Sequence, residues 1–240
     1  MLITFEGIDG CGKSTQARLL AERLQGEGIE TILIREPGGT RLSEHIRDIV
    51  LNTKYDHPLS HTSELLLFAA SRAQLVKEVI LPALAREAVV ICDRFTDSTM
   101  AYQGYGRGIP LAHVAHVNSL ASAELEPDLT FLIDVPIENA IERRKGTNDD
   151  RMESESMVFF KNVLKGYMKL AEEHRDRIHV IDGLDSMEDV QHSIWRLVEY
   201  ERGNDLRHAS HAELSEASQS LLEAEPATYS FDVTSEVLAS

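Results

Sequence analysis

Brief apolar runs alternate with longer amphipathic stretches over the first 200 residues of the chain. The brief runs lack strict alternation of apolar and polar positions, which is typical of strands buried on both faces of a parallel sheet. We expect five such strands, at residues 2–6, 30–34, 88–92, 129–133 and 178–181.

The stretches between these strands carry apolar residues at helical spacing. Alternation of strand and helix implies right-handed crossovers and a layered α/β fold whose ligands gather at the carboxyl ends of the strands. We therefore predict one domain over residues 1–200, with a five-stranded parallel sheet flanked by helices. The expected helices are 13–25, 41–51, 63–86 with a kink at Pro82, 110–123, 137–144, 155–173 and 187–200.

The pattern changes at about residue 201, where large apolar side chains become rare. Residues 201–240 carry two arginines against eight acidic residues. This composition predicts an acidic, disordered extension, with one amphipathic helix over 209–224. A solvated extension without catalytic duty is favoured over a segment that docks a partner.

The 240 residues are 42% hydrophobic and 27% charged, which is ordinary usage for a globular protein. The net charge of −16 opposes binding of a nucleic acid polymer, because such binding needs a basic face. No apolar run is long enough to cross a membrane, and residues 1–5 lack a basic leader region. We therefore expect a cytoplasmic protein, in which Cys11 and Cys92 form no disulfide.

Residues 6–15, EGIDGCGKST, fit the pattern G-x-x-x-x-G-K-[ST] between an expected strand and an expected helix. In such a P-loop the backbone N–H groups surround phosphate oxygens, Lys13 reaches the terminal phosphates, and the Ser14 hydroxyl joins a Mg²⁺ shell. The motif predicts binding of a nucleoside triphosphate with magnesium, in a three-layer P-loop NTPase fold. The expected nucleotide-binding residues are Gly7, Asp9, Gly10, Cys11, Gly12, Lys13, Ser14 and Thr15.

A P-loop alone does not separate a GTPase, an ATP-driven machine and a small-molecule kinase. The chain has no N-K-x-D match for guanine recognition, and a motor is usually larger. A small-molecule kinase needs a second phosphate pocket. The segments REPGGT, residues 35–40, and Asp93-Arg94 follow expected strands and supply candidates for that pocket.

Two acids follow apolar strands and are candidates to hold magnesium, Asp93 and Asp134. Asp93 is favoured because Arg94 follows it at once, and an arginine at a strand end beside a P-loop is suited to binding phosphate.

Helical spacing predicts a pocket for a planar base. Phe68 and Arg72 are four residues apart on a helical stretch, so a stacking surface and a hydrogen-bond donor share one face. Thr99, Tyr102 and Gln103 are three and four apart and project together. Such a group suits a heterocycle with carbonyl and imide edges.

Five motifs in this order, EGIDGCGKST, REPGGT, FAASRAQ, DRFTDSTMAYQGYGRG and PDLTFLIDV, resemble bacterial thymidylate kinase across residues 1–200. The resemblance implies transfer of the γ-phosphoryl group of ATP to thymidine monophosphate (dTMP), giving the diphosphate (dTDP), in a cytoplasmic homodimer. It further implies that Phe68 stacks on thymine and Arg72 binds its carbonyl edge, that Thr99 and Gln103 lie near the base, and that Tyr102 favours deoxyribose.

For the phosphate end, the resemblance implies that Arg35 and Arg94 hold the acceptor phosphate and that Asp9 approaches the 3′-hydroxyl or the magnesium shell. The attacking phosphate oxygen has a second pKa of about 6 and is already ionised at neutral pH, so no general base is required. The expected catalytic groups are therefore Lys13, Arg94, magnesium and an arginine that closes over the site.

The closing arginine is expected from a lid at residues 143–153, a polar break between two helices. Some members of the family carry an arginine inside the P-loop, at the position of Gly10, whereas others supply it from the lid. Gly10 places this chain in the second group. Arg151 is favoured for the role, with Arg143 as the competitor.

Two other functions stay open at this point. The first is a related kinase with another nucleoside or nucleotide acceptor. The second is a nucleotide-dependent switch whose acidic tail engages a partner, although a switch needs no second phosphate pocket.

Overall fold

The computed structural model describes residues 1–51, 59–145 and 150–205. Its five strands are all parallel and lie in the order β2-β3-β1-β4-β5, so the strand that leads into the P-loop is central. The predicted parallel sheet is thereby confirmed. The strands are β1 Leu2–Glu6, β2 Thr31–Arg35, β3 Val89–Asp93, β4 Leu129–Asp134 and β5 Ile178–Asp182.

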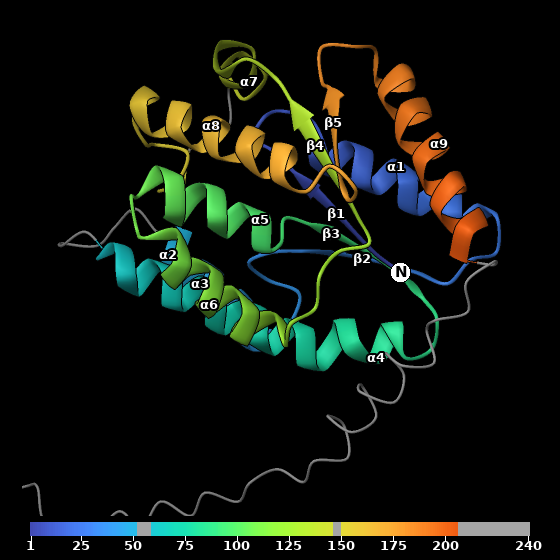
Figure 1. The fold of residues 1–240 in the computed structure, drawn as a ribbon, viewed down its shortest axis with the longest axis horizontal. Helices are drawn as coiled ribbons and strands as arrows, with labels where there is room; N and C mark the ends of the chain where they lie inside the picture. Colours follow the sequence, from blue (N-terminus) through green and yellow to red (C-terminus); the bar gives the residue numbers. More distant parts are fainter. Residues whose placement is uncertain (52–58, 146–149, 206–240) are drawn as a thin grey trace, which may run out of the picture.

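Helices cover both faces of the sheet and complete three layers (Figure 1). Helices α1 and α9 pack on one face, and the α3–η1–α4 stretch, α5 and α8 lie on the other. The helical elements of the described residues are α1 Lys13–Gly26, α2 Arg41–Leu51, α3 His61–Leu75, η1 Val76–Ile80, α4 Leu81–Leu84, α5 Thr96–Thr99, η2 Met100–Gly106, α6 Leu111–Ser122, α7 Ile137–Arg143, α8 Met157–Glu173 and α9 Met187–Asp205.

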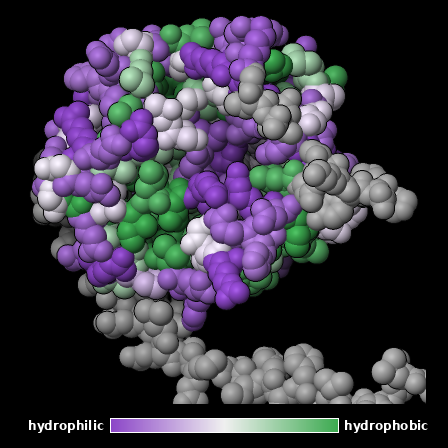
Figure 2. Space-filling view, turned by 180° about the vertical axis from the view of Figure 1, so that it is seen from behind, coloured by the Kyte–Doolittle hydropathy of each residue, from purple (hydrophilic) through white to green (hydrophobic). Residues whose placement is uncertain are grey.

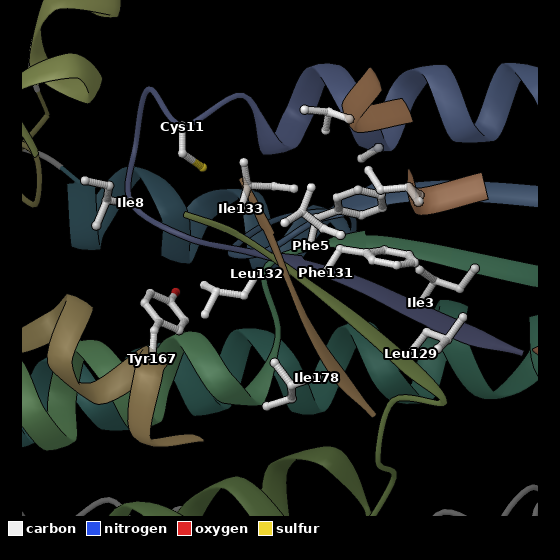
Figure 3. Packing of buried hydrophobic residues seen from close by; sticks show 14 of the residues in the cluster. Ile3, Phe5, Ile8, Cys11, Leu129, Phe131, Leu132, Ile133, Tyr167 and Ile178 are labelled. Carbon is white, nitrogen blue, oxygen red and sulfur yellow. The ribbon is translucent and has the colours of Figure 1, made fainter. Parts of the chain in front are cut away.

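The main core lies between the central strands and α1. Phe5 of β1 and Phe131 of β4 are fully buried, with ring centroids 5.3 Å apart (Figure 3). Leu20 and Leu24 of α1 are equally buried against this face. Each large side chain of this kind contributes about 1.5–3 kcal/mol on burial. The core thus fixes α1, and with it the P-loop, against the middle of the sheet.

Two helical stretches differ from the expectation. The predicted helix 63–86 contains a π-helical turn, η1, which ends at Ile80, two residues before Pro82. Proline has no N–H to donate to the carbonyl four residues earlier, so the wider turn accommodates the lost hydrogen bond. The second stretch, α5 followed by the π-helical η2, was not predicted as a separate helix.

Helix α9 extends to Asp205, five residues into the predicted tail. The rest of that tail, with its predicted helix 209–224, lies outside the described residues. Among the helices that the structure describes, none has the length and apolar character needed to cross a membrane.

Candidate active site

The P-loop leaves β1 at Glu6 and enters α1 at Lys13, with Gly12 in the left-handed region at φ 103°. The first turn of α1 therefore presents backbone N–H groups that no capping side chain from Gly12 occupies, a geometry that binds phosphate. Gly10 lies against α7, where an added Cβ would come within 2.3 Å of the carbonyl oxygen of Ala140. This contact leaves no room for an arginine at position 10 in the present backbone.

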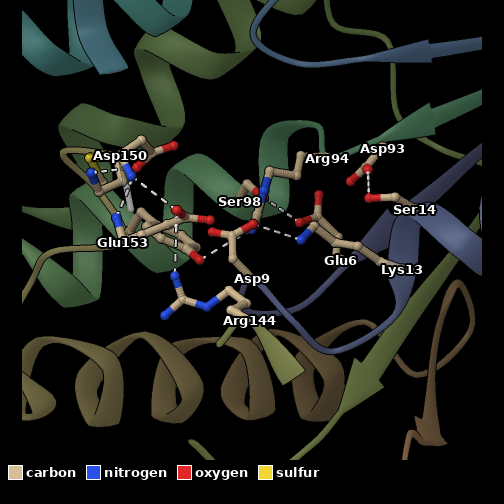
Figure 4. Close-up of polar contacts among 12 residues, drawn as sticks. Glu6, Asp9, Lys13, Ser14, Asp93, Arg94, Ser98, Arg144, Asp150 and Glu153 are labelled. Carbon is tan, nitrogen blue, oxygen red and sulfur yellow. Dashed lines mark hydrogen bonds and ion pairs between the residues drawn. The ribbon is translucent and has the colours of Figure 1, made fainter. Parts of the chain in front are cut away.

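Asp9 joins the two cations nearest the loop (Figure 4). Its Oδ1 accepts from Lys13 Nζ at 2.9 Å and from Arg94 NH2 at 2.7 Å. Burial opposes ionisation of Asp9, but the charges of Arg94 and Lys13 prevail and lower its pKa below the usual range. Burial and Arg94 likewise oppose the charge on Lys13, yet Asp9 keeps the pKa of that ammonium raised. All three groups are therefore charged at neutral pH.

A buried carboxylate, Glu6, lies behind Arg94. Arg94 NH1 contacts the hydroxyls of Ser98 and Tyr167 at 3.2 and 3.3 Å, and Glu6 accepts from both hydroxyls and from the Phe95 N–H. Burial, with the nearby charge of Asp97, raises the pKa of Glu6 to about 7. Sequence reasoning missed Glu6, although an acid that ends an otherwise apolar strand was a usable signal.

The backbone of Arg94 is held in the left-handed region, at φ 73°. A non-glycine residue in that region costs about 1–3 kcal/mol, and such strain is concentrated at functional sites. The conformation turns the chain directly after β3 and brings the guanidinium beside the P-loop.

Ser14 and Asp93 meet next to the P-loop, where the Ser14 hydroxyl donates to Asp93 Oδ2. The other carboxylate oxygen, Oδ1, is buried and has no hydrogen-bond partner among the described residues. A hydroxyl beside an unpaired carboxylate oxygen fits a hard cation such as Mg²⁺. Of the two strand-end acids left open by the sequence, Asp93 is the one that contacts Ser14.

A pocket of about 570 Å³, including its open mouth, adjoins this charged group. Figure 2 shows a hollow with mainly hydrophilic walls on the rear face of the molecule. The structure brings together six of the predicted acceptor residues in its wall, Phe68, Arg72, Arg94, Thr99, Tyr102 and Gln103, together with Asp9.

Arg72 is only 2% exposed and is held by several partners. Its Nε donates to Glu36, its NH1 to Asn118, and its NH2 to Thr99 and the Phe95 carbonyl. The structure gives NH1 one hydrogen bond among the described residues, which leaves its second N–H for a ligand. Helical spacing singled out Arg72 but did not predict its hydrogen-bond partners.

Arg35, predicted to hold the acceptor phosphate, does not line this pocket. Its side chain is 47% exposed, its guanidinium pairs with Glu44 at 3.0 Å, and its NH1 donates to the Pro37 carbonyl. Arg47 of α2 lines the pocket instead and donates to the same carbonyl at 2.9 Å. The sequence did not point to Arg47, because spacing within α2 does not show which face of that helix turns toward the pocket. The role of Arg35 stays a prediction, and would need its pair with Glu44 to open.

The two candidate closing arginines lie on opposite sides of the site. Arg151 pairs with Glu64 at 2.6 Å and donates to the Val50 carbonyl, on the pocket side. Arg143 donates to the carbonyl of Cys11 within the P-loop, at 3.3 Å. Residues 146–149 of the expected lid lie outside the described residues. The choice between Arg151 and Arg143 stays a prediction.

A central P-loop with a second, arginine-lined pocket defines the class of nucleotide-dependent phosphotransferases. Residues 5–194 match the family model of thymidylate kinase. The chain is 48% identical over 195 residues to a thymidylate kinase of Kosmotoga olearia, covering 81% of this chain and 93% of the relative. For a thymidylate kinase of Caldanaerobacter subterraneus the identity is 47%, covering 82% and 94%.

The crystal structure of a thymidylate kinase from Ehrlichia chaffeensis superimposes with a TM-score of 0.68 at 38% identity, covering 82% of this chain and 98% of that one. The protein therefore belongs to the thymidylate kinase family.

Replacing Glu6 by glutamine tests the buried carboxylate. Because the folded pKa of about 7 exceeds the ordinary 4.5, the folded protein binds this proton more tightly than the unfolded chain does. The stability gained from protonation is complete below about pH 4.5 and is lost as the pH rises through 7. We expect the unfolding free energy of the wild type, minus that of Glu6→Gln, to fall by about 2–3 kcal/mol as the pH rises from 4.5 to 7. Denaturant titration at each pH measures this difference.

The matched control is Glu22→Gln, on the exposed face of α1. The difference in unfolding free energy between the wild type and Glu22→Gln should change little with pH. A flat difference for Glu6→Gln as well would contradict the raised pKa.

Proposed function

We propose that the protein transfers the γ-phosphoryl group of ATP to dTMP, producing dTDP, with ATP on the P-loop and dTMP in the adjoining pocket. The observation that carries the proposal is the Lys13–Asp9–Arg94 group, which stands where these two sites meet. Membership of the thymidylate kinase family supports the choice of acceptor.

The obstacle to this reaction is electrostatic, because two phosphate groups must approach in line. Lys13 would bind the terminal phosphates of ATP, while Arg94 and Arg47 would hold the acceptor phosphate. The acceptor oxygen is already ionised at neutral pH, so the protein has only to position it and neutralise charge. Asp9 keeps Lys13 and Arg94 at hydrogen-bond distance from one carboxylate oxygen and so fixes their separation.

The base would be recognised by the aromatic and polar side chains that line the pocket. Phe68 would stack on thymine, and the remaining N–H of Arg72 NH1 would reach its carbonyl oxygen. Thr99 and Gln103 would lie beside the base. Tyr102 is 6% exposed and its hydroxyl contacts Arg94 at 3.3 Å, which suits a side chain that restricts room at the sugar.

Magnesium belongs to the proposal as well, with Ser14 and Asp93 as the residues that would hold it. When bound, the ion would neutralise charge on the β- and γ-phosphates of ATP. The buried, unpartnered Oδ1 of Asp93 supports this placement.

Purified protein with ATP and magnesium should release ADP when dTMP is added, and far more slowly with dCMP or dAMP. Cytosine has a ring nitrogen acceptor and an amino group where thymine has an imide N–H and a carbonyl, so it leaves buried polar groups unpaired. We expect kcat/KM to favour dTMP by about 100-fold or more in a coupled ADP assay. Equal turnover of all acceptors would refute the assignment. Including dUMP measures tolerance for the missing methyl group.

Replacing Asp93 by asparagine should raise the magnesium concentration needed for half-maximal activity by about tenfold or more. Asparagine keeps the size of the side chain but removes the charge that draws the cation. Asp134→Asn, at the end of β4, which β1 separates from β3, is the matched control and should shift this concentration little. Equal shifts in the two variants would speak against Asp93 as the magnesium ligand.

A homodimer in the cytoplasm completes the proposal. The α2, α3 and α6 helices pack side by side (Figure 1) and carry exposed large apolar side chains, which is the character of a surface that associates. Cys11 and Cys92 are free thiols, in keeping with a reducing compartment. The exposed side chains are Leu42, Ile49, Leu66, Leu111 and Leu120.

We expect sedimentation to give twice the 26.8 kDa chain mass. Leu66→Glu, on α3, should shift the protein to monomer, because an association surface does not accept an unpaired charge. Leu184→Glu, at a position of similar exposure before α9, should leave the dimer intact. Monomeric wild-type protein would rule the dimer out.

A further inference from the structure

A second buried carboxylate, Glu64, lies beside Gln103, a residue of the acceptor pocket. It belongs to the first turn of α3 and is 1% exposed. Three side chains from other parts of the chain donate to it, namely Gln103, Arg107 and Arg151. Gln103 is the member of this group that also lines the pocket.

The four contacts occupy both oxygens of Glu64. Oε1 accepts from Gln103 Nε2 at 2.8 Å and from Arg107 Nε at 3.0 Å. Oε2 accepts from Arg107 NH2 at 3.0 Å and from Arg151 NH2 at 2.6 Å. Burial favours the neutral acid, but the bonds from Arg107 and Gln103 and the arginine charges lower the pKa of Glu64. The carboxylate is ionised and therefore only accepts hydrogen bonds.

This fixes the direction of the Gln103 amide. An amide has one donor end and one acceptor end, and only its NH2 end bonds to an ionised carboxylate. Turning the amide over would bring its carbonyl oxygen against Glu64 Oε1, a repulsive contact in a site that water does not reach. The carbonyl oxygen, Oε1, is consequently directed away from Glu64, and the structure gives it no partner among the described residues.

We infer that Glu64 is a positioning residue which, through the Gln103 amide, makes the pocket accept a base that presents an imide N–H. The inference rests on the proposed placement of the acceptor base beside Phe68 and Gln103. With its orientation fixed, Gln103 offers an acceptor to the base, and Arg72 offers a donor. Thymine has a matching N–H and carbonyl, whereas cytosine presents a ring nitrogen acceptor and an amino group.

The test is the ratio of kcat/KM for dTMP to that for dCMP in the Glu64→Gln variant. A neutral amide at position 64 donates as well as accepts, so the Gln103 amide is free to turn over. We expect the ratio to fall by about tenfold or more, with part of the change arising from better use of dCMP. A general loss of packing would lower both rates and leave their ratio unchanged.

Glu155→Gln is the matched control. Glu155 pairs with the same Arg107 at 2.6 Å but has no contact with Gln103 among the described interactions, so its variant should keep the wild-type ratio within about twofold. Glu64→Asp retains an acceptor-only group and should preserve the ratio better than Glu64→Gln. Folding of each variant is checked by thermal unfolding.

An unchanged ratio in folded Glu64→Gln would overturn the inference. If that variant does not fold, the same ratio is measured in Gln103→Leu. This change removes the amide oxygen that would accept from the base, while Glu64 keeps its contacts with Arg107 and Arg151. An unchanged ratio in Gln103→Leu would overturn the inference equally. A wild-type protein without preference for dTMP would instead refute the proposed function, so the two failures are distinguishable.

Discussion

One carboxylate oxygen, Asp9 Oδ1, holds together the two cations on which the site depends. Lys13 reaches it from the start of α1 and Arg94 from the end of β3, and both lie within hydrogen-bond distance. The parallel sheet makes this meeting possible, because β1 and β3 are neighbours whose carboxyl ends open at the same edge. An otherwise acidic protein, with a net charge of −16, thus concentrates positive charge at one place.

Three further carboxylates support polar groups of the site, Glu36 from within the pocket wall, and Glu6 and Glu64 from beside it. Glu6 holds the hydroxyls that contact Arg94, Glu36 holds Arg72, and Glu64 holds Gln103. A buried carboxylate is costly unless hydrogen bonds compensate its loss of water. The polar wall of the pocket is therefore held by hydrogen bonds to buried carboxylates, although Glu36 Oε1 has no partner among the described residues.

The sequence predicted the features that follow a local rule. Strand runs, the P-loop spacing and the four-residue separation of Phe68 and Arg72 depend on near neighbours in the chain, and the structure reproduces each of them. The contacts that the sequence missed join distant segments. Choosing Arg47 over Arg35 as a pocket residue requires knowing how α2 is oriented against the sheet, and the role of Glu64 appears only once α3 and η2 are side by side.

Residues 150–155 touch both halves of the site. On one side Arg151 is bound to Glu64 and to the end of α2. On the other, Glu153 pairs with Arg144, whose stem lies against Gly10 of the P-loop. A single strap thus spans donor and acceptor sites. If binding of one nucleotide displaces this strap and so changes the affinity for the other, binding of the second must change the affinity for the first by the same factor, since thermodynamic linkage is reciprocal.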